Sequence, residues 1–416
     1  MVVTLLDWTQ ARFILYAGIP GSKKSSHIIR RVSALRNSGA ADNGNKYIVF
    51  KHKKDDVSVE DRVTSPTRRD EVPAICVSSV DQVAEAIIKN PDARHIFLSG
   101  IHNFEDPRIV DLVREIPDSG RNLIGTLIPL TYENQPFNHS GQVMCLADHI
   151  MMLHALCADC NAPAFRSMYG GRNPKDEMLS VPKCLRHYQI PSQERMHVSY
   201  LHEQEGSLHV IWGTMANDKS GTLTDKLYDL ESTGKRTVLF HAKDRVLGIT
   251  LTRDNRAMDA YVFESVVQAR KLIRERKAEY IAFEEFQLSE IPGQIELIKE
   301  LIDEGRNVII TLTNRDIGDR PFLDAPLVMP YATSLENNHS SICAICSKHP
   351  AVKNRRDVKR QDSGKDIWVP DSYKAGIIAL DNDPAERRYQ PACRDCYKVS
   401  DAPETAFKLP DYKKPA

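Results

Sequence analysis

The chain of 416 residues carries 56 acidic and 56 basic side chains, so its formal net charge is zero, and 41% of its residues are hydrophobic. This composition is typical of globular proteins, the length suits two domains, and the neutral balance argues against a general polyanion binder. No apolar run reaches the roughly 18 residues of a membrane span. Residues 1–17 show neither a signal-peptide nor a transit-peptide pattern. We therefore expect a cytoplasmic protein that does not contact membranes.

Short apolar runs alternate with helical patterns along the first half. Runs rich in β-branched and aromatic residues occupy 13–17, 47–50, 95–98 and 123–127, and helical patterns occupy 27–35 and 81–88. Strands that alternate with amphipathic helices are typical of βαβ units, which form a parallel sheet. The first half is therefore predicted to be an α/β domain.

The second half repeats this order of elements. Apolar runs follow at 208–212, 237–240, 280–283 and 307–311, and helical patterns follow at 262–276 and 295–304. Pro136-Phe137 recurs 185 residues later as Pro321-Phe322. A repeated series of elements indicates an internal duplication. It predicts two domains, 1–195 and 207–416, joined by a polar stretch near 196–207.

Each half carries an altered phosphate-binding loop after its first apolar run. Residues 18–25 and 213–220 nearly match the pattern G-x-x-x-x-G-K-[ST], whose backbone N–H groups and lysine hold phosphates. The glycine before the lysine is replaced by Lys23 in one copy and by Asp218 in the other. That glycine permits a backbone conformation that is unfavourable for other residues, and Asp218 would add a carboxylate beside the anion. The candidate nucleotide-binding residues of the second loop are Gly213, Lys219 and Ser220.

Each half also ends in four potential metal ligands, arranged as two pairs separated by two residues. They are Cys157, Cys160, Cys184 and His187 in the first half, and Cys343, Cys346, Cys393 and Cys396 in the second. Two such pairs are typical of closed, tetrahedral structural zinc sites. Reactive or merely buried cysteines are the alternative, but repetition of the pattern in both halves argues against it. We predict two structural zinc ions, each contributing on the order of 10 kcal/mol to folding.

Together these motifs resemble the thymidine kinase family of the zinc-containing type. Residues 47–56 and 71–79 resemble the family's second strand and the segment after it, and residues 389–396 are similar to its terminal Y-x-P-x-C-R-x-C motif. The resemblance covers nearly all of both halves. It implies an α/β fold of two tandem P-loop-type parallel-sheet domains, each with a small structural zinc lobe. It also implies phosphoryl transfer from ATP to a deoxynucleoside.

The resemblance further implies an acidic pair after the third strand, with a glutamate as the base. In the first half this pair is Ser99-Gly100, so that half is predicted to be inactive. In the second half it is Glu284-Glu285, followed by Gln287. Glu284 is therefore a further candidate of the nucleotide site, and Glu285 is a candidate residual base.

The substrate-binding segment of the second half also departs from the family. The pattern A-x-x-T-x-R reads here as residues 351–356, with Asn354 in place of the threonine. The segment between Cys346 and Cys393 has 46 residues, against 23 between Cys160 and Cys184. With Asp218, these changes argue against kinase activity, and the altered phosphate loop argues against binding of ATP and Mg²⁺. We expect a catalytically impaired protein, with a thymidine kinase active only in the second half as the alternative.

A basic segment suggests what an impaired kinase could bind. Five of the eight residues 353–360 are basic, namely Lys353, Arg355, Arg356, Lys359 and Arg360. An exposed basic loop on a zinc lobe would suit the phosphate backbone of RNA, and Trp368 could stack on bases. We therefore expect a binding or regulatory module for RNA or a ribonucleoprotein particle such as the ribosome. A solvated loop and a protein–protein scaffold remain open as alternatives, and the sequence does not indicate the oligomeric state.

Overall fold

The computed structural model describes most of the chain, which falls into two compact units. The described residues are 12–38, 46–55, 61–65, 70–172, 178–188, 205–242, 249–251, 257–337, 341–363, 365–374 and 386–412. Unit 1 comprises Met1–Arg195 and Glu404–Ala416, and unit 2 comprises Met196–Pro403. The predicted second domain extended to residue 416, whereas the C-terminal segment groups with the first unit. The predicted join at 196–207 lies almost wholly outside the described residues.

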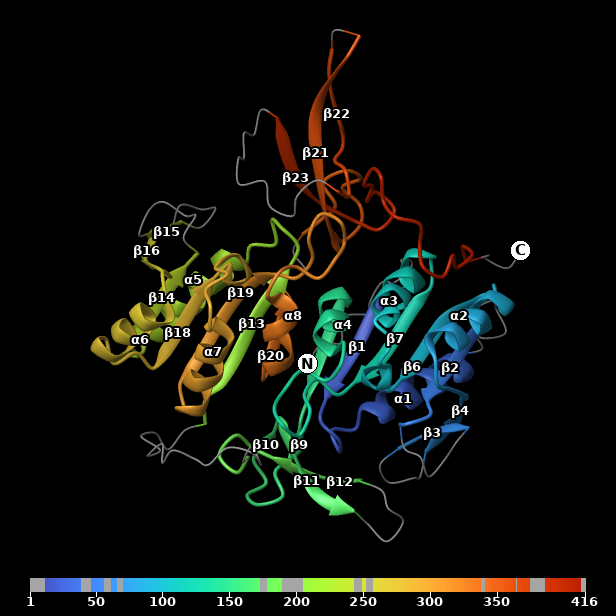
Figure 1. The fold of residues 1–416 in the computed structure, drawn as a ribbon, viewed down its shortest axis with the longest axis horizontal. Coiled ribbons are helices and arrows are strands. Elements are labelled where there is room, and N and C mark those ends of the chain that lie inside the picture. Colours follow the sequence, from blue (N-terminus) through green and yellow to red (C-terminus); the bar gives the residue numbers. More distant parts are fainter. Residues whose placement is uncertain are drawn as a thin grey trace. The chain divides into compact units, whose positions relative to one another are not determined.

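Unit 1 is built on a six-stranded parallel sheet with the strand order β5-β2-β6-β7-β1-β8 (Figure 1). The strands are β1 (Phe13–Gly18), β2 (Lys46–His52), β5 (Ile75–Val77), β6 (Ala93–Ser99), β7 (Asn122–Leu127) and β8 (His149–Leu153). All six residues of β1 are buried, as are those of β7, because helices cover both faces of a parallel sheet. The four predicted apolar runs of this half are therefore confirmed as strands.

In the described part of unit 1, four helices accompany this sheet. They are α1 (Lys24–Asn37), α2 (Val80–Lys89), α3 (Arg108–Asp118) and α4 (Ser140–Leu146). Helix α2 begins with a capping box, in which the Ser79 side chain accepts from the backbone of Gln82. Helix α1 begins directly after Lys23, which has no side-chain cap. A short hairpin of β3 (Arg62–Thr64) and β4 (Glu71–Pro73) and the 3₁₀ turn η1 (Ile101–Asn103) complete the main part of the unit.

Unit 2 repeats this topology, with the strand order β17-β14-β18-β19-β13-β20. Its strands are β13 (Ser207–Gly213), β14 (Thr237–His241), β17 (Tyr261–Val262), β18 (Tyr280–Glu284), β19 (Asn307–Thr313) and β20 (Ser334–Asn337). Its helices are α5 (Lys219–Ser232), α6 (Val266–Glu275), α7 (Gln294–Asp303) and α8 (Ala325–Val328) (Figure 1). The 3₁₀ turns are η2 (Phe286–Leu288) and η3 (Met329–Tyr331). The small hairpin of β15 (Ile249–Leu251) and β16 (Ala257–Asp259) lies between β14 and β17 in the chain. The matching strand orders confirm the predicted fold, and helix α6 is shorter than predicted because Ser265 caps it.

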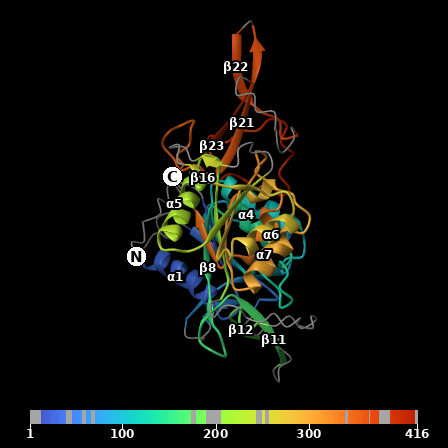
Figure 2. The ribbon, with the colours of Figure 1, turned by 90° about the vertical axis from the view of Figure 1, so that its left-hand side faces the viewer.

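Each unit carries a small β-rich lobe with the cysteine pairs. In unit 1 it contains the hairpins β9 (Ala155–Leu156) with β10 (Pro163–Ala164) and β11 (Arg166–Arg172) with β12 (Met178–Lys183). In unit 2 it contains β21 (Lys353–Asp362) paired on one side with β22 (Lys365–Pro370) and on the other with β23 (Arg387–Ala392). Figure 2 shows β21 and β22 as a long hairpin that extends beyond β23. The basic segment expected to be a loop is thus the central strand of a sheet.

Among the described residues, no helix combines the length and the apolar character that crossing a membrane requires.

Candidate nucleotide sites and metal clusters

In unit 2 the backbone of the phosphate loop, residues 213–220, binds the side chain of the loop's own lysine, Lys219. Strand β13 ends at Gly213, whose φ of 151° favours glycine, and an added Cβ there would lie 2.1 Å from Nδ2 of Asn217. Lys219 is only 5% exposed, and its Nζ donates to the Thr214 carbonyl at 2.9 Å. The predicted residues Gly213 and Lys219 therefore both belong to one tight turn that leads into α5.

Asp218 brings a negative charge to the beginning of α5. Its φ of 49° lies in the left-handed region, and its side chain makes no capping hydrogen bond. The carboxylate of Asp218 lies against the first turn of α5, since a Cβ added to Gly221 would be 2.5 Å from Oδ1 of Asp218. The N-terminus of a helix attracts anions through its free N–H groups and its dipole. The carboxylate of Asp218 therefore adds a negative charge beside the first turn of α5, the end of the helix that attracts anions.

The acidic pair of unit 2 lies at the end of β18. Glu284 is 1% exposed and accepts a hydrogen bond from the Ser220 hydroxyl. Glu285 follows with a φ of 51°, its N–H donates to Oγ1 of Thr311 at 2.9 Å, and its Oε2 accepts from Nε2 of Gln287 at 2.7 Å. The structure thus brings Ser220 and Glu284 into contact and holds Glu285 beside them. A hydroxyl next to a carboxylate is a pair that can hold Mg²⁺ in phosphoryl-transfer sites.

Unit 1 keeps the same loop geometry with different side chains. Lys23 has a φ of 65°, and Nζ of Lys24 donates to the Ile19 carbonyl at 2.8 Å, as Lys219 does in unit 2. Burial lowers the pKa of Lys24 to about 8, and the Asp55 carboxylate only partly offsets that effect. The lysine side chain is therefore directed inward in both units.

The acidic pair is absent from unit 1, but its backbone is retained. Gly100 has a φ of 76°, and its N–H donates to Oγ1 of Thr126 at 3.1 Å, which matches Glu285 and Thr311. The Ser99 hydroxyl donates to Oδ2 of Asp55 at 2.6 Å. Sequence reasoning missed Asp55, because this carboxylate follows β2 instead of β6.

A buried histidine also distinguishes unit 1. His102 stands 185 residues before Gln287 and so occupies the corresponding position. Burial, together with the nearby Lys24 and His52, lowers the pKa of His102 to about 3. The imidazole is therefore neutral at physiological pH, and its position offers no carboxylate or amide oxygen.

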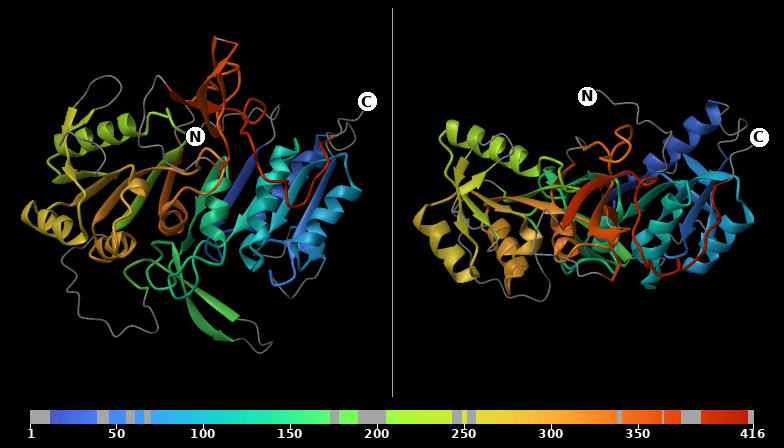
Figure 3. Two further views of the ribbon diagram at one scale, coloured as in Figure 1. Left: turned by 45° about the horizontal axis from the view of Figure 1, so that its top comes forward. Right: turned by 90° about the horizontal axis from the view of Figure 1, so that it is seen from above.

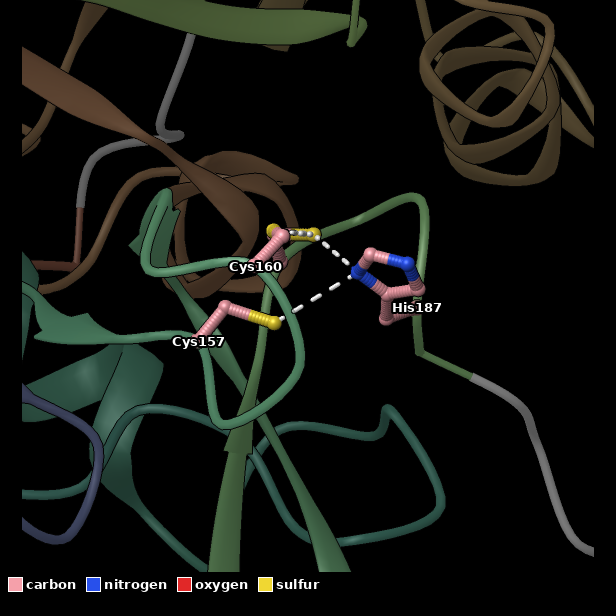
Figure 4. A group of neighbouring side chains, drawn as sticks. Cys157, Cys160 and His187 are labelled. Atoms are coloured by element: carbon pink, nitrogen blue, oxygen red, sulfur yellow. Dashed lines mark hydrogen bonds between the residues drawn. The ribbon is translucent and has the colours of Figure 1, made fainter.

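The first cysteine cluster could hold a metal ion. The ligand atoms of Cys157, Cys160, Cys184 and His187 all lie within 4.8 Å of one another. Nδ1 of His187 lies 3.6 Å from Sγ of Cys157 and 3.2 Å from Sγ of Cys184. Figure 4 shows the side chains of Cys157 and His187 directed toward each other. Three thiols and one imidazole form a donor set that fits zinc.

The second cluster has the same geometry with four thiols. The ligand atoms of Cys343, Cys346, Cys393 and Cys396 also lie within 4.8 Å of one another. His349 is close by, with Nδ1 at 3.8 Å from Sγ of Cys346. A four-thiol set leaves no open coordination position, so it fits a structural zinc. The structure therefore brings together all eight ligands predicted from the sequence.

The predicted basic segment is largely engaged within unit 2. Nζ of Lys353 lies 2.8 Å from Oδ2 of Asp319, and both side chains are only 3% exposed. Arg356 is also buried, pairs with Asp371 and lies over the ring of Tyr389. The expectation of an exposed loop is thus wrong for Lys353 and Arg356, because acidic residues distant in sequence neutralise them.

The other three basic residues are more accessible. Arg355 pairs with Asp357 at 2.7 Å and is 13% exposed, whereas Lys359 pairs with Asp366 and is 30% exposed. Arg360 is exposed. On the neighbouring strand, the guanidinium of Arg388 lies 4.6 Å from the ring centroid of Trp368. Of the five predicted basic residues, the more exposed pair, Lys359 and Arg360, therefore lies in the outer part of the β21–β22 hairpin.

Asn354 connects the phosphate loop of unit 2 to its zinc lobe. Its Oδ1 accepts from the N–H of Met215 at 2.7 Å, and its Nδ2 donates to the Arg315 carbonyl at 2.7 Å. From the sequence, Asn354 was only a departure from a threonine. The structure shows that this side chain bridges two segments of the site.

Comparisons with known proteins identify the family. The thymidine kinase family model matches residues 11–180 and again residues 206–397. A thymidine kinase of Ureaplasma urealyticum serovar 10 is 25% identical over 183 residues, which cover 41% of this chain and 79% of that protein. A thymidine kinase of Mesoplasma florum is 28% identical over 127 residues, which cover 30% of this chain and 56% of that protein. Because the family model matches most of the chain in two successive copies, the chain belongs to the thymidine kinase family as a tandem pair of its domains.

Proposed function

We propose that this protein is a catalytically impaired member of the family that acts as a binding module. The observation that carries the proposal is the Asp218 carboxylate over the first turn of α5. A carboxylate at this position repels the phosphates of ATP. It is also itself attracted by the positive end of the helix dipole, which would otherwise attract those phosphates. Unit 2 therefore binds a nucleotide more weakly than an intact phosphate loop would.

In its described part, unit 1 has no carboxylate at the position of the base. The position of the base is held by Gly100. The side chain of Asp55 lies next to Gly100, and its carboxylate already accepts a hydrogen bond from Ser99. Transfer to a nucleoside hydroxyl needs a carboxylate that can take its proton. Unit 1 therefore acts as a folded platform and not as a second kinase.

A residual thymidine kinase activity in unit 2 is the second candidate function. It is favoured by Glu285, which keeps a left-handed backbone and a hydrogen bond from Gln287. Non-glycine residues in this region cost of order 1–3 kcal/mol and cluster at functional sites. The relatives that match the chain are named thymidine kinases, which makes thymidine the nucleoside to test first.

An activity assay separates these two candidates. The chain is incubated with ATP, Mg²⁺ and thymidine, in parallel with a Glu285→Gln variant. Impairment predicts no thymidine monophosphate above the level of the variant. Product that forms with the natural chain and disappears with Glu285→Gln would establish kinase activity and reject the proposal that the protein is catalytically impaired.

We further propose that the binding partner is RNA, and that the outer part of the β21–β22 hairpin contacts it. Arg360 is exposed, Lys359 is partly exposed, and Trp368 lies beside Arg388. Guanidinium groups bind phosphates, and an aromatic ring can stack on an unpaired base. The buried Lys353 and Arg356 serve the fold in this proposal and do not contact RNA.

The RNA proposal is tested by reversing charges only where they are accessible. A Lys359→Glu and Arg360→Glu double variant should lose RNA recovered in a pull-down, while the same change at Lys271 and Arg274 on α6 is the matched control. Nuclease treatment before elution distinguishes partners. Equal RNA recovery with both double variants would reject the hairpin as the contact, and partners that resist nuclease would favour a protein scaffold.

A further inference from the structure

The C-terminal tail, residues 404–412, follows unit 2 in sequence but belongs to unit 1. It contains neither helix nor strand, so its conformation depends on the groups that it meets. Figure 3 shows this segment, coloured red, running beside α3. Its contacts with unit 1 involve both the main chain and the aromatic side chains of the tail.

Main-chain groups of the tail are held by the end of α3 and the residues that follow it. The N–H of Phe407 donates to the Glu115 carboxylate at 3.2 Å, and the N–H of Tyr412 donates to the Ser119 carbonyl at 2.8 Å. Backbone hydrogen bonds of this kind hold an extended segment and fix its register. The tail is thus bound along its length and not at a single point.

Arg121 is the centre of this contact. Its side chain is fully buried, and its Nη1 donates to the Pro410 carbonyl at 2.6 Å and to Oγ of Ser119 at 2.7 Å. Its Nη2 donates to the Pro91 carbonyl at 3.1 Å. A guanidinium stays charged at any physiological pH, and a buried charge needs its hydrogen-bond acceptors. The tail therefore supplies one acceptor to a charge that unit 1 buries.

Two aromatic side chains of the tail complete the contact. The guanidinium of Arg108 lies 5.7 Å from the ring centroid of Phe407, and that of Arg94 lies 5.8 Å from the ring of Tyr412. Both rings are half-buried. Cations over aromatic rings add attraction to the burial of apolar area, so these rings act as anchors at the two ends of the bound segment.

We propose that unit 1 carries a peptide-binding site for an extended segment of the pattern aromatic-x-x-Pro-x-aromatic, occupied in cis by Phe407–Tyr412. Glu115, Ser119 and Arg121 bind the peptide backbone, and Arg94 and Arg108 bind the two rings. Because the tail is tethered to the same chain, its effective concentration at the site is high. Unit 1 therefore acquires its full stability only when the end of the chain has docked.

A chain that ends after Pro403 tests the site directly. A fluorescent peptide with the sequence of residues 404–416 should bind this shortened chain saturably and the full chain at least tenfold more weakly, because the site is occupied. The same peptide with alanine in place of Phe407 and Tyr412 should bind at least tenfold more weakly. A chain that ends after Tyr412 is the control and should behave like the full chain. Failure of the peptide to bind a folded shortened chain would overturn the proposal.

A second measurement keeps the test valid if the shortened chain does not fold. In the full chain with Phe407→Ala and Tyr412→Ala, hydrogen exchange of the amides of residues 115–121 should be at least tenfold faster, with no change in α5. Unchanged exchange at 115–121 would reject the site. A concentration-dependent dimer of the full chain that disappears in the shortened chain would place the tail on a second copy and overturn docking in cis.

Discussion

Replacing Asp319 with asparagine should destabilise unit 2 severely, because this carboxylate lies between two buried cations. It is 2.8 Å from Nζ of Lys353 and 3.0 Å from Nη1 of Arg315, and the side chains of all three residues are at most 3% exposed. Asparagine keeps the shape but leaves both cations facing a neutral amide. Removing one partner of a buried ion pair costs about 3–5 kcal/mol.

The magnitude can be measured by urea and thermal unfolding. Each kcal/mol shifts the melting temperature of a domain of this size by about 2–4 °C, so Asp319→Asn should lower that of unit 2 by roughly 6–20 °C. Two of the chain's three tryptophans, Trp212 and Trp368, lie in unit 2 and report its unfolding by fluorescence. The control is Asp366→Asn, which removes the partly exposed pair with Lys359 and should cost less than about 1 kcal/mol.

The pH dependence gives an independent check on the same network. Burial would raise the pKa of Asp319, but Lys353 and Arg315 outweigh it and hold the pKa far below its usual range. A depressed folded-state pKa stabilises above the unfolded-state pKa of about 3.9 and loses that effect on acidification. The difference between the natural chain and Asp319→Asn should therefore shrink below about pH 4. Equal unfolding midpoints for the natural chain and Asp319→Asn at pH 7 would refute the reasoning, since they would mean that water solvates Lys353 and Arg315.

Two further predictions concern the metal clusters and unit 1. Elemental analysis should find two zinc ions per chain; Cys343→Ser should lose one and destabilise unit 2, while retention of both ions would contradict the assignment of the second cluster. The pKa of His102 in the folded state is about 3, so below about pH 6.5 the unfolded state binds a proton that the folded state does not. As the pH falls, the free energy of unfolding of unit 1 should therefore decrease by about 1.4 kcal/mol per pH unit because of this group. His102→Gln, which introduces the residue of unit 2, should flatten the dependence of unfolding free energy on pH by one proton, and an unchanged slope would contradict the burial of this imidazole.

The sheet centres could be predicted from the sequence, but the sheet edges could not. Strands such as β1 and β19 are continuous apolar runs, since both of their faces are covered. The edge strand β5 has only three residues, two of them exposed, and β20 reads Ser-Leu-Glu-Asn. Short, partly polar edge strands carry no periodic signal, because only pairing with a neighbour defines them.

The metal ligands and the basic segment differ in how local their chemistry is. The spacing of Cys157 and Cys160 is the one that a tetrahedral metal site favours, and it is visible in four residues of sequence. The neutralisation of Lys353 depends on Asp319, and that of Arg356 on Asp371, which the fold brings together. A run of basic residues therefore looks exposed in sequence until the distant carboxylates are known. The tail contact was hidden for the same reason, because Arg121 and Pro410 are 289 residues apart.

The two altered phosphate loops allow backbone strain and charge to be separated. Lys23 and Asp218 have similar left-handed backbones, with φ of 65° and 49°, so glycine at either position should relieve a similar strain of about 1–2 kcal/mol. The charges are opposite. Asp218→Gly should therefore strengthen binding of an ATP analogue to unit 2, by about tenfold if 1.4 kcal/mol of repulsion is removed, whereas Lys23→Gly should weaken any anion binding to unit 1. Isothermal titration of both variants measures this contrast. Tighter binding after both substitutions would mean that strain and not charge impairs these loops, and the role assigned to the Asp218 carboxylate would be wrong.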